Sequence, residues 1–141
     1  MYMQRGKDFI GIGTGGIIVN EQGEILLQKR KKEPEAECWS LPGGAIEYGE
    51  TAEEAIIREI KEETNLDCRH TLFIGYCDYI LNKQTTHWVS MFFLIQCDNY
   101  DAQNMETDKH SEQKWFNINK LPKHLTINTV HAINLYNNLR K

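Results

Sequence analysis

The stretch GAIEYGETAEEAIIREIKEETNL, residues 44–66, decides more about the fold than any other part of the chain. Residues 52–64 within it are predicted to form a helix, because they are rich in good helix formers and contain no Gly or Pro. Thr51 and Glu54 have the spacing of a capping box at the first turn. Asn65 is expected to end the helix, since Asn tolerates a left-handed backbone.

This helix has an apolar sector and an acidic sector side by side. At about 100° per residue, these sectors contain three isoleucines and three glutamates: Ile56, Ile57, Ile60, Glu59, Glu62 and Glu63. Carboxylates at i, i+3 and i+4 repel one another, so the helix gains no stability from collecting them. Mg²⁺ or Mn²⁺ would reverse that interaction, because hard cations prefer carboxylate oxygens. A solvated surface explains most acidic clusters, but the neighbouring loop and arginine favour a metal site here.

The residues around the acidic sector support a ligand site. Leu41-Pro42-Gly43-Gly44 predicts a loop, and two adjacent glycines let the backbone approach a ligand closely. Arg58 lies one helical turn before Glu62, where its planar guanidinium can fix the orientation of a carboxylate. The order along the chain is therefore glycine loop, short linker and acidic helix.

Residues 44–66 resemble the Nudix box, whose pattern is G-x5-E-x7-R-E-U-x-E-E-x-G-U, with U an aliphatic residue. The matching positions are Gly44, Glu50, Arg58-Glu59-Ile60, Glu62-Glu63 and Leu66. One position departs, since Asn65 stands where the pattern has its final glycine. Asn is the next-best residue for a left-handed cap, so the departure leaves the resemblance intact.

The resemblance implies a fold, a domain organisation and a cofactor. We expect an α/β (α+β) fold of the Nudix type, an α/β/α sandwich with a mixed β-sheet between helices, forming a single domain over residues 1–141. The implied cofactor is Mg²⁺ or Mn²⁺, and its implied ligands are Glu59, Glu62, Glu63 and Gly44.

The resemblance also implies catalytic roles, for Glu62, Glu63, Arg58 and Glu112. Arg58 is expected to orient a ligand carboxylate, while Glu50 either pairs with Arg58 or supports a metal-bound water. Members of the family take their general base from within the box or from a loop near the final strand. Glu112 is the loop candidate, because it precedes Trp115-Phe116, and a plain surface acid is the alternative.

The substrate is expected to be a nucleotide. The phosphates are expected to meet Arg30 and the backbone of Gly43 and Gly44. Similarity to MutT-like members implies hydrolysis of a nucleoside triphosphate to a nucleoside monophosphate and pyrophosphate. ADP-ribose or another nucleotide sugar is the alternative substrate. A non-catalytic nucleotide-binding regulator is the alternative function, and the complete acidic set argues for turnover.

Periodicity and turn residues place the other elements. The sequence predicts a strand over 9–19 with a hairpin partner over 23–28 and a turn at 20–23, strands over 72–81 and 87–97 around a turn at 82–86, a short strand over 113–116 and a helix over 127–139. Residues 11–16 match G-x-G-x-x-G, but no helix follows them, so we reject a dinucleotide site. One of the two alternating faces of residues 87–92 is expected to line a pocket.

Composition limits the partners. A net charge of −4 gives no general attraction to nucleic acid or an anionic membrane, so neither a nucleic acid duplex nor a membrane is expected as a partner. The 4 cysteines show no C-x2-C pairing, and no signal peptide is evident, which predicts reduced thiols in a cytoplasmic protein. A homodimer is compatible with a small domain of this family, although no residue pattern establishes it.

Overall fold

The computed structural model describes residues 2–82 and 85–141. The elements in this part of the chain are β1 (Gly11–Ile18), β2 (Glu24–Arg30), β3 (Trp39–Ser40), β4 (Gly43–Ala45), α1 (Ala52–Thr64), β5 (Cys68–Asn82), β6 (Thr86–Cys97), β7 (His110–Asn117) and α2 (Ile127–Leu139). None of the helices in these residues is long and apolar enough to span a membrane.

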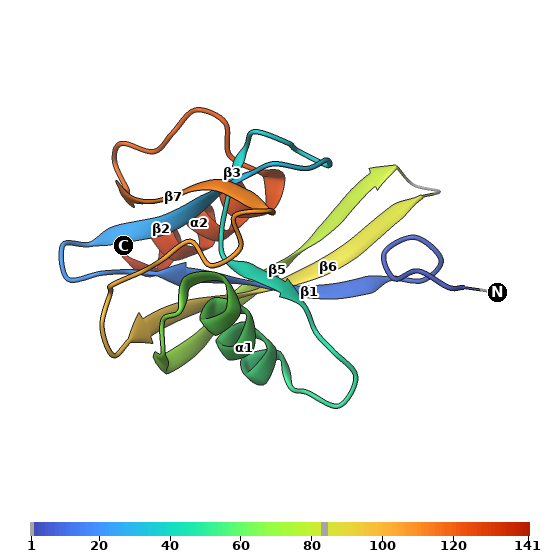
Figure 1. The fold of residues 1–141 in the computed structure, drawn as a ribbon, viewed down its shortest axis with the longest axis horizontal. Helices are drawn as coiled ribbons and strands as arrows, with labels where there is room; N and C mark the ends of the chain where they lie inside the picture. Colours follow the sequence, from blue (N-terminus) through green and yellow to red (C-terminus); the bar gives the residue numbers. More distant parts are fainter. Residues whose placement is uncertain (1, 83–84) are drawn as a thin grey trace.

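The strands form two sheets (Figure 1). The larger sheet has the order β4-β1-β6-β5, in which β1 and β6 run parallel and the other neighbours run antiparallel. The smaller sheet has the order β3-β2-β7 and is antiparallel throughout. The larger sheet is therefore the mixed sheet that the resemblance implies.

The two helices cover opposite faces of the mixed sheet. The apolar residues of α1 share a core cluster with Ile18 and Phe93. Those of α2 share a second cluster with Ile17 and Phe92. Because successive side chains of a strand point to opposite faces, α1 and α2 lie on opposite sides of β1 and β6. This arrangement confirms the predicted α/β/α sandwich.

The predicted hairpin between the first two strands is wrong. The turn itself forms, with the Gly23 N–H donating to the Asn20 carbonyl over 3.0 Å. Beyond it, Val19 and Ile25 make a single bridge, after which β1 and β2 enter different sheets. A strand has only two edges, and those of β1 are occupied by β4 and β6.

The loop predicted at 41–44 is partly wrong, because Gly43 and Gly44 pair with β1 as part of the short strand β4, and β3 was likewise not predicted. Strands β5, β6 and β7 are longer than predicted, and α2 has its predicted bounds. β5 begins at Cys68 and β7 begins at His110, so pairing with β6 and β2 extends both strands beyond their apolar segments. The predicted turn at 82–86 lies partly outside the described residues, since 83 and 84 are not among them.

Both ends of α1 form the caps that the sequence predicts. The Thr51 hydroxyl accepts from the Glu54 N–H over 3.1 Å, and the Glu54 carboxylate accepts from the Thr51 N–H over 2.9 Å. Asn65 has φ 63° and donates its N–H to the Lys61 carbonyl. The two caps fix which residues of the helix face the glycine loop.

We predict that Asn65→Ala lowers the free energy of unfolding by about 1 kcal/mol, because Ala has no polar side chain to offset a left-handed backbone. Asn65→Gly is the matched control, and its stability should equal or exceed that of the wild type. Urea unfolding measures both. Equal stability of the Ala and Gly variants would contradict this account of the cap.

Candidate active site

Glu63 is the most deeply placed acid of the site. It lies in the last turn of α1 and is 3% exposed. The Gly43 N–H donates to its Oε1 over 2.9 Å. Burial raises the pKa of Glu63 well above its usual value, against the opposing effect of the Gly43 hydrogen bond. The structure thus keeps a carboxyl in a position where its negative charge is costly.

The second acid, Glu59, lies directly against the glycine loop. A Cβ at Gly44 would collide with the Glu59 carboxylate, so glycine here lets that carboxylate lie directly against β4. The Gly44 carbonyl accepts from the Thr14 hydroxyl over 2.9 Å, which fixes β4 beside β1. Burial raises the pKa of Glu59, and the neighbouring Arg58 only partly offsets that effect.

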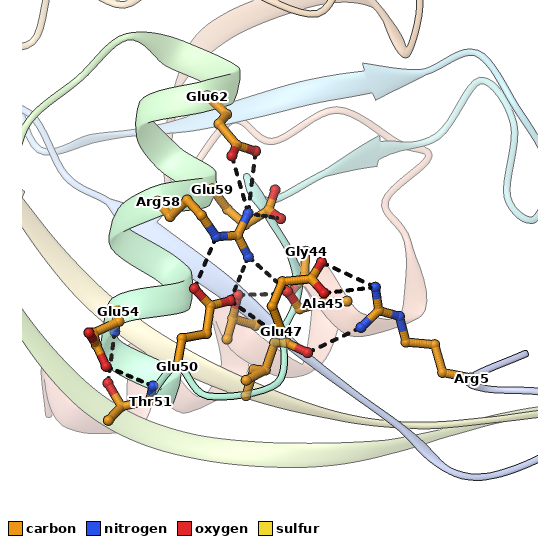
Figure 2. A network of polar contacts seen from close by, with 12 residues as sticks. Arg5, Gly44, Ala45, Glu47, Glu50, Thr51, Glu54, Arg58, Glu59 and Glu62 are labelled. Atoms are coloured by element: carbon orange, nitrogen blue, oxygen red, sulfur yellow. Dashed lines mark hydrogen bonds and ion pairs between the residues drawn. The ribbon is translucent and has the colours of Figure 1, made fainter.

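Arg58 is the centre of a network of polar contacts (Figure 2). Its Nε and Nη2 donate to both oxygens of Glu50, over 3.0 and 2.6 Å. Its Nη1 donates to Glu59 over 2.9 Å and to Glu62 over 3.3 Å. Nη2 also reaches the Ala45 carbonyl. One guanidinium therefore connects the acidic helix with residues 45–50, which precede it.

Of the two roles expected for Glu50, the structure shows the pairing with Arg58. The pKa of Glu50 is lowered to about 2, first by the hydrogen bond from Arg58 and then by that from the Glu47 N–H. The same contacts raise the pKa of Arg58. Glu50 and Arg58 are consequently both charged at neutral pH. Glu50 neutralises the charge of Arg58 at Nε and Nη2, whereas Glu62 contacts Nη1.

The donor set fits a hard divalent cation. Among residues 2–82 and 85–141, no three His, Cys, Asp or Glu side chains are already gathered around a common point. Glu59 and Glu62 contact Arg58, and Glu63 contacts Gly43. Two desolvated carboxylates nevertheless lie beside a glycine backbone, and the charge of Glu59 further raises the pKa that burial has raised at Glu63. A dication would neutralise both acids.

A cavity of about 600 Å³ adjoins Glu63. Glu63, Gly43 and Gly44 lie at one part of its wall. Further wall residues come from both sheets, from the start of α2 and from the N-terminal segment: Gln4, Arg5, Gly6, Lys7, Gly13, Thr14, Gly15, Arg30, Tyr79, Trp88, Ser90, Phe92, His110, Asn128 and Thr129. Of the two faces of residues 87–92, the one with Trp88, Ser90 and Phe92 lines this cavity. Its size and mixed polarity suit a nucleotide.

Arg30, the predicted phosphate contact, lies in the cavity wall together with His110. Its Nε donates to the Pro34 carbonyl over 2.9 Å, which anchors the head of the side chain. Burial, followed by the charges of Arg30 and Lys109, lowers the pKa of His110 to about 4. His110 is therefore neutral at physiological pH, and the cationic charge at this part of the wall belongs to Arg30.

The structure does not bring Glu112 to the acidic helix. Gln113, the next residue on β7, donates from Nε2 to the Glu63 carbonyl over 3.3 Å and so faces α1. Because side chains alternate along a strand, Glu112 faces the other way. Its carboxylate lies 3.7 Å from Lys29 and is not part of the cavity wall.

A different acid, Glu106, lies close to the site. Its charge adds to the effect of burial in raising the pKa of both Glu59 and Glu63. The Met105 N–H donates to the Glu63 carbonyl over 3.0 Å, which ties this loop to the end of α1. Lys109 Nζ lies 3.3 Å from Glu106 Oε2. The sequence carries no motif for this placement, because it depends on backbone contacts between loop and helix, from Met105 to Glu63 and from Gln103 to Thr64.

Comparison with known proteins gives one consistent family. The profile described as NUDIX domain matches residues 10–136. The chain is 38% identical over 106 residues to the ADP-ribose pyrophosphatase of Methanocaldococcus jannaschii, covering 75% of this chain and 62% of that protein. It is 36% identical over 127 residues to a Bacillus subtilis protein provisionally named an 8-oxo-dGTP diphosphatase, covering 89% and 79% of the two chains.

The fold is shared with a solved structure of substantial sequence similarity. The MutT NUDIX hydrolase from Burkholderia pseudomallei superposes with a TM-score of 0.84 at 36% identity, covering 89% of this chain and 97% of that one. The acidic helix lies within residues 10–136, which the NUDIX profile matches.

Glu63→Gln tests the cost of the buried charge in the metal-free protein. A raised folded-state pKa stabilises the fold at pH values below the unfolded value of 4.5, and that contribution is lost as pH rises through the folded pKa. We therefore expect the stability of Glu63→Gln relative to wild type to increase as pH rises from 4.5. Thermal unfolding across this range in chelator measures the trend.

Added Mg²⁺ gives the complementary result. It should stabilise the wild type by about 2.7 kcal/mol at a hundredfold excess over its Kd and should leave Glu63→Gln nearly unchanged. A Glu63→Gln variant that gains as much stability from Mg²⁺ as the wild type would contradict a cation at this acid.

Proposed function

The chain belongs to the Nudix family, and we propose that it is a metal-dependent hydrolase that converts a nucleoside triphosphate into a nucleoside monophosphate and pyrophosphate. The observation that carries this proposal is the pair of desolvated acids beside the Gly43-Gly44 backbone: Glu63 lines the wall of a nucleotide-sized cavity, and Glu59 lies next to Gly44 behind that wall. The chain spans 62% of the archaeal relative, so reaction and substrate are both part of the proposal.

The metal-binding part of the proposal concerns four groups: the carboxylates of Glu59, Glu62 and Glu63 and the carbonyl of Gly44. Bound Mg²⁺ or Mn²⁺ would neutralise phosphate oxygens and lower the pKa of a water. The Gly43 N–H holds Glu63 in orientation, and Arg58 holds Glu59. Glu62 is 49% exposed in its side chain, so it can leave Arg58 with little desolvation cost.

The hydrolytic step needs a group that accepts a proton. The oxygen of a water attacks the α-phosphorus, and the bond from that phosphorus to the bridging oxygen breaks. Pyrophosphate leaves with the electron pair of that bond. The proton of the attacking water passes to a carboxylate. We propose Glu106 for this role, with Glu62 as the alternative acid within the helix, because each is near enough for its charge to raise the pKa of Glu59.

Arg30 and the cavity wall supply recognition. Arg30 is proposed to meet a phosphate of the substrate and the aromatic and polar residues of β6 its nucleoside, because all of them line the cavity. ADP-ribose is the second candidate substrate, because the relative with 38% identity is named an ADP-ribose pyrophosphatase. A regulator that binds without turnover is less well supported, since all three glutamates of α1 are present.

A substrate panel tests the reaction. The purified protein with Mg²⁺ or Mn²⁺ should release pyrophosphate from a nucleoside triphosphate, and Glu63→Gln should reduce the rate by at least ~100-fold, equivalent to about 2.7 kcal/mol of activation free energy. Release of product from ADP-ribose alone would replace the proposed substrate. No metal-dependent hydrolysis of nucleoside triphosphates, ADP-ribose or dinucleoside polyphosphates would overturn the proposed function.

The two loop acids can be separated by matched variants. We expect Glu106→Gln to lower kcat by about 100-fold, in the range of general base removal, and Glu112→Gln to keep it within about 3-fold, because Glu112 faces away from α1. Steady-state kinetics with saturating Mg²⁺ measures both. The reverse pattern would restore Glu112 as the base.

A further inference from the structure

The segment before β1 is an ordered loop. The Gly6 N–H donates to the Phe9 carbonyl over 2.6 Å, and the Asp8 N–H donates to the Gln4 carbonyl over 2.7 Å. The Asp8 carboxylate accepts from the Gln4 N–H over 2.7 Å. Residues 4–9, the N-terminal loop, lie outside the part of the chain that the NUDIX profile matches, which starts at residue 10. Figure 1 shows the loop at the end of β1 that is remote from α2.

The N-terminal loop packs against the indole of Trp88. Gly6 has φ +79°, and a Cβ at this position would overlap the Trp88 ring. The Gly6 carbonyl accepts from the His87 N–H over 2.8 Å, which holds the loop beside β6. A Cβ at Gly11 would also overlap the indole. Two glycine backbones therefore fix the position of this ring, which is part of the cavity wall.

Arg5 connects the loop with the acidic helix. Its Nη1 donates to the Ile46 carbonyl and its Nη2 to the Glu47 carboxylate, each over 3.2 Å. The Glu47 N–H in turn donates to Glu50 over 2.8 Å, and Glu50 is the bidentate partner of Arg58. Figure 2 shows this continuous chain of contacts from Arg5 to Arg58.

The loop also contributes directly to the cavity. Gln4, Arg5, Gly6 and Lys7 all line it, although they precede the matched region. Two of the four carry positive charge, in a chain whose net charge is −4. An anionic ligand would thus meet cationic side chains on this side.

We propose that the N-terminal loop is a specificity-determining part of the substrate site, in which Gly6 seats Trp88 as a flat wall for the ring of a nucleotide and Arg5 is a positioning residue. Arg5 sets the distance between that wall and the acidic helix by holding the loop to Glu47. The inference rests on the proposed function for its ligand class, a nucleotide. Loss of the loop contacts should weaken nucleotide binding and raise KM, with a smaller effect on kcat.

A glycine pair offers a matched test. Gly23 has φ +77° and nothing within 4 Å of a built Cβ, so Gly23→Ala carries the same backbone strain as Gly6→Ala without any contact with Trp88. Both variants should lose about 1 kcal/mol of stability to backbone strain, and Gly6→Ala should lose more, because its Cβ displaces the Trp88 ring. Only Gly6→Ala should raise KM, by about 10-fold, equivalent to about 1.4 kcal/mol of binding free energy.

A charge swap tests Arg5 without altering the glycine. Arg5→Glu and Glu47→Arg should each raise KM by about 5-fold, the upper range for an exposed ion pair, and the double variant should recover most of the loss. Arg69→Glu, on the exposed part of β5 and outside the cavity wall, is the control for a change of charge. Circular dichroism verifies that each variant is folded.

Binding without hydrolysis separates this inference from the proposed function. Quenching of tryptophan fluorescence by AMP, dGMP and ADP-ribose gives a Kd in the absence of turnover. Weaker binding in Gly6→Ala than in Gly23→Ala supports the inference even if no substrate is hydrolysed. Equal binding by those two variants, no recovery in the double charge swap, or no binding of any of the three nucleotides to the wild type would overturn it.

Discussion

A carboxyl group placed inside a folded protein must find a partner for its charge or lose that charge. Glu63 is placed this way, and much of the surrounding structure depends on how its position is held. The Gly43 N–H is its hydrogen-bond donor, and Gly44 gives the adjacent Glu59 room beside β4. Two such acids would favour a divalent cation over the metal-free state, so the cost of burying their charges would contribute to the metal affinity that we propose.

Arg58 has the opposite effect on the site, because its positive charge offsets the negative charges of the acids around it. Its guanidinium pairs with Glu50 in front of the helix and reaches Glu59 and Glu62 along it. The same network of hydrogen bonds continues from Glu50 to Glu47 and, through Arg5, to the wall of the cavity. Hydrogen bonds that begin at Arg58 thus connect the acids proposed for catalysis with the cavity wall proposed for recognition.

The sequence predicts best where the determinants are local. Thr51, Glu54 and Asn65 act within a few residues of themselves, and the caps of α1 follow their spacing. The alternation on β6 predicts two faces but not which one meets the cavity, since that depends on where α2 and the smaller sheet pack. The hairpin after β1 fails because β4 and β6 compete for the edges of β1 from far along the chain.

In the candidate site, too, the local features are predicted from the sequence and the long-range contacts are not. The acids of α1 are evident from their spacing, whereas the loop acid is not. Glu112 was one residue from a position facing α1, and Glu106 is brought close by the tie between Met105 and Glu63. The contact of Gly6 with Trp88 likewise joins residues far apart in the sequence and leaves no periodic signal.

A structure of the protein crystallised with Mn²⁺ gives the most direct test of the central claim, because the anomalous signal of Mn²⁺ locates the ion independently of any assumed ligand. The account predicts an anomalous peak in contact with the carboxylates of both Glu59 and Glu63, with Arg58 still paired to Glu50. A peak remote from these two acids at saturating Mn²⁺, or none at all, would contradict it.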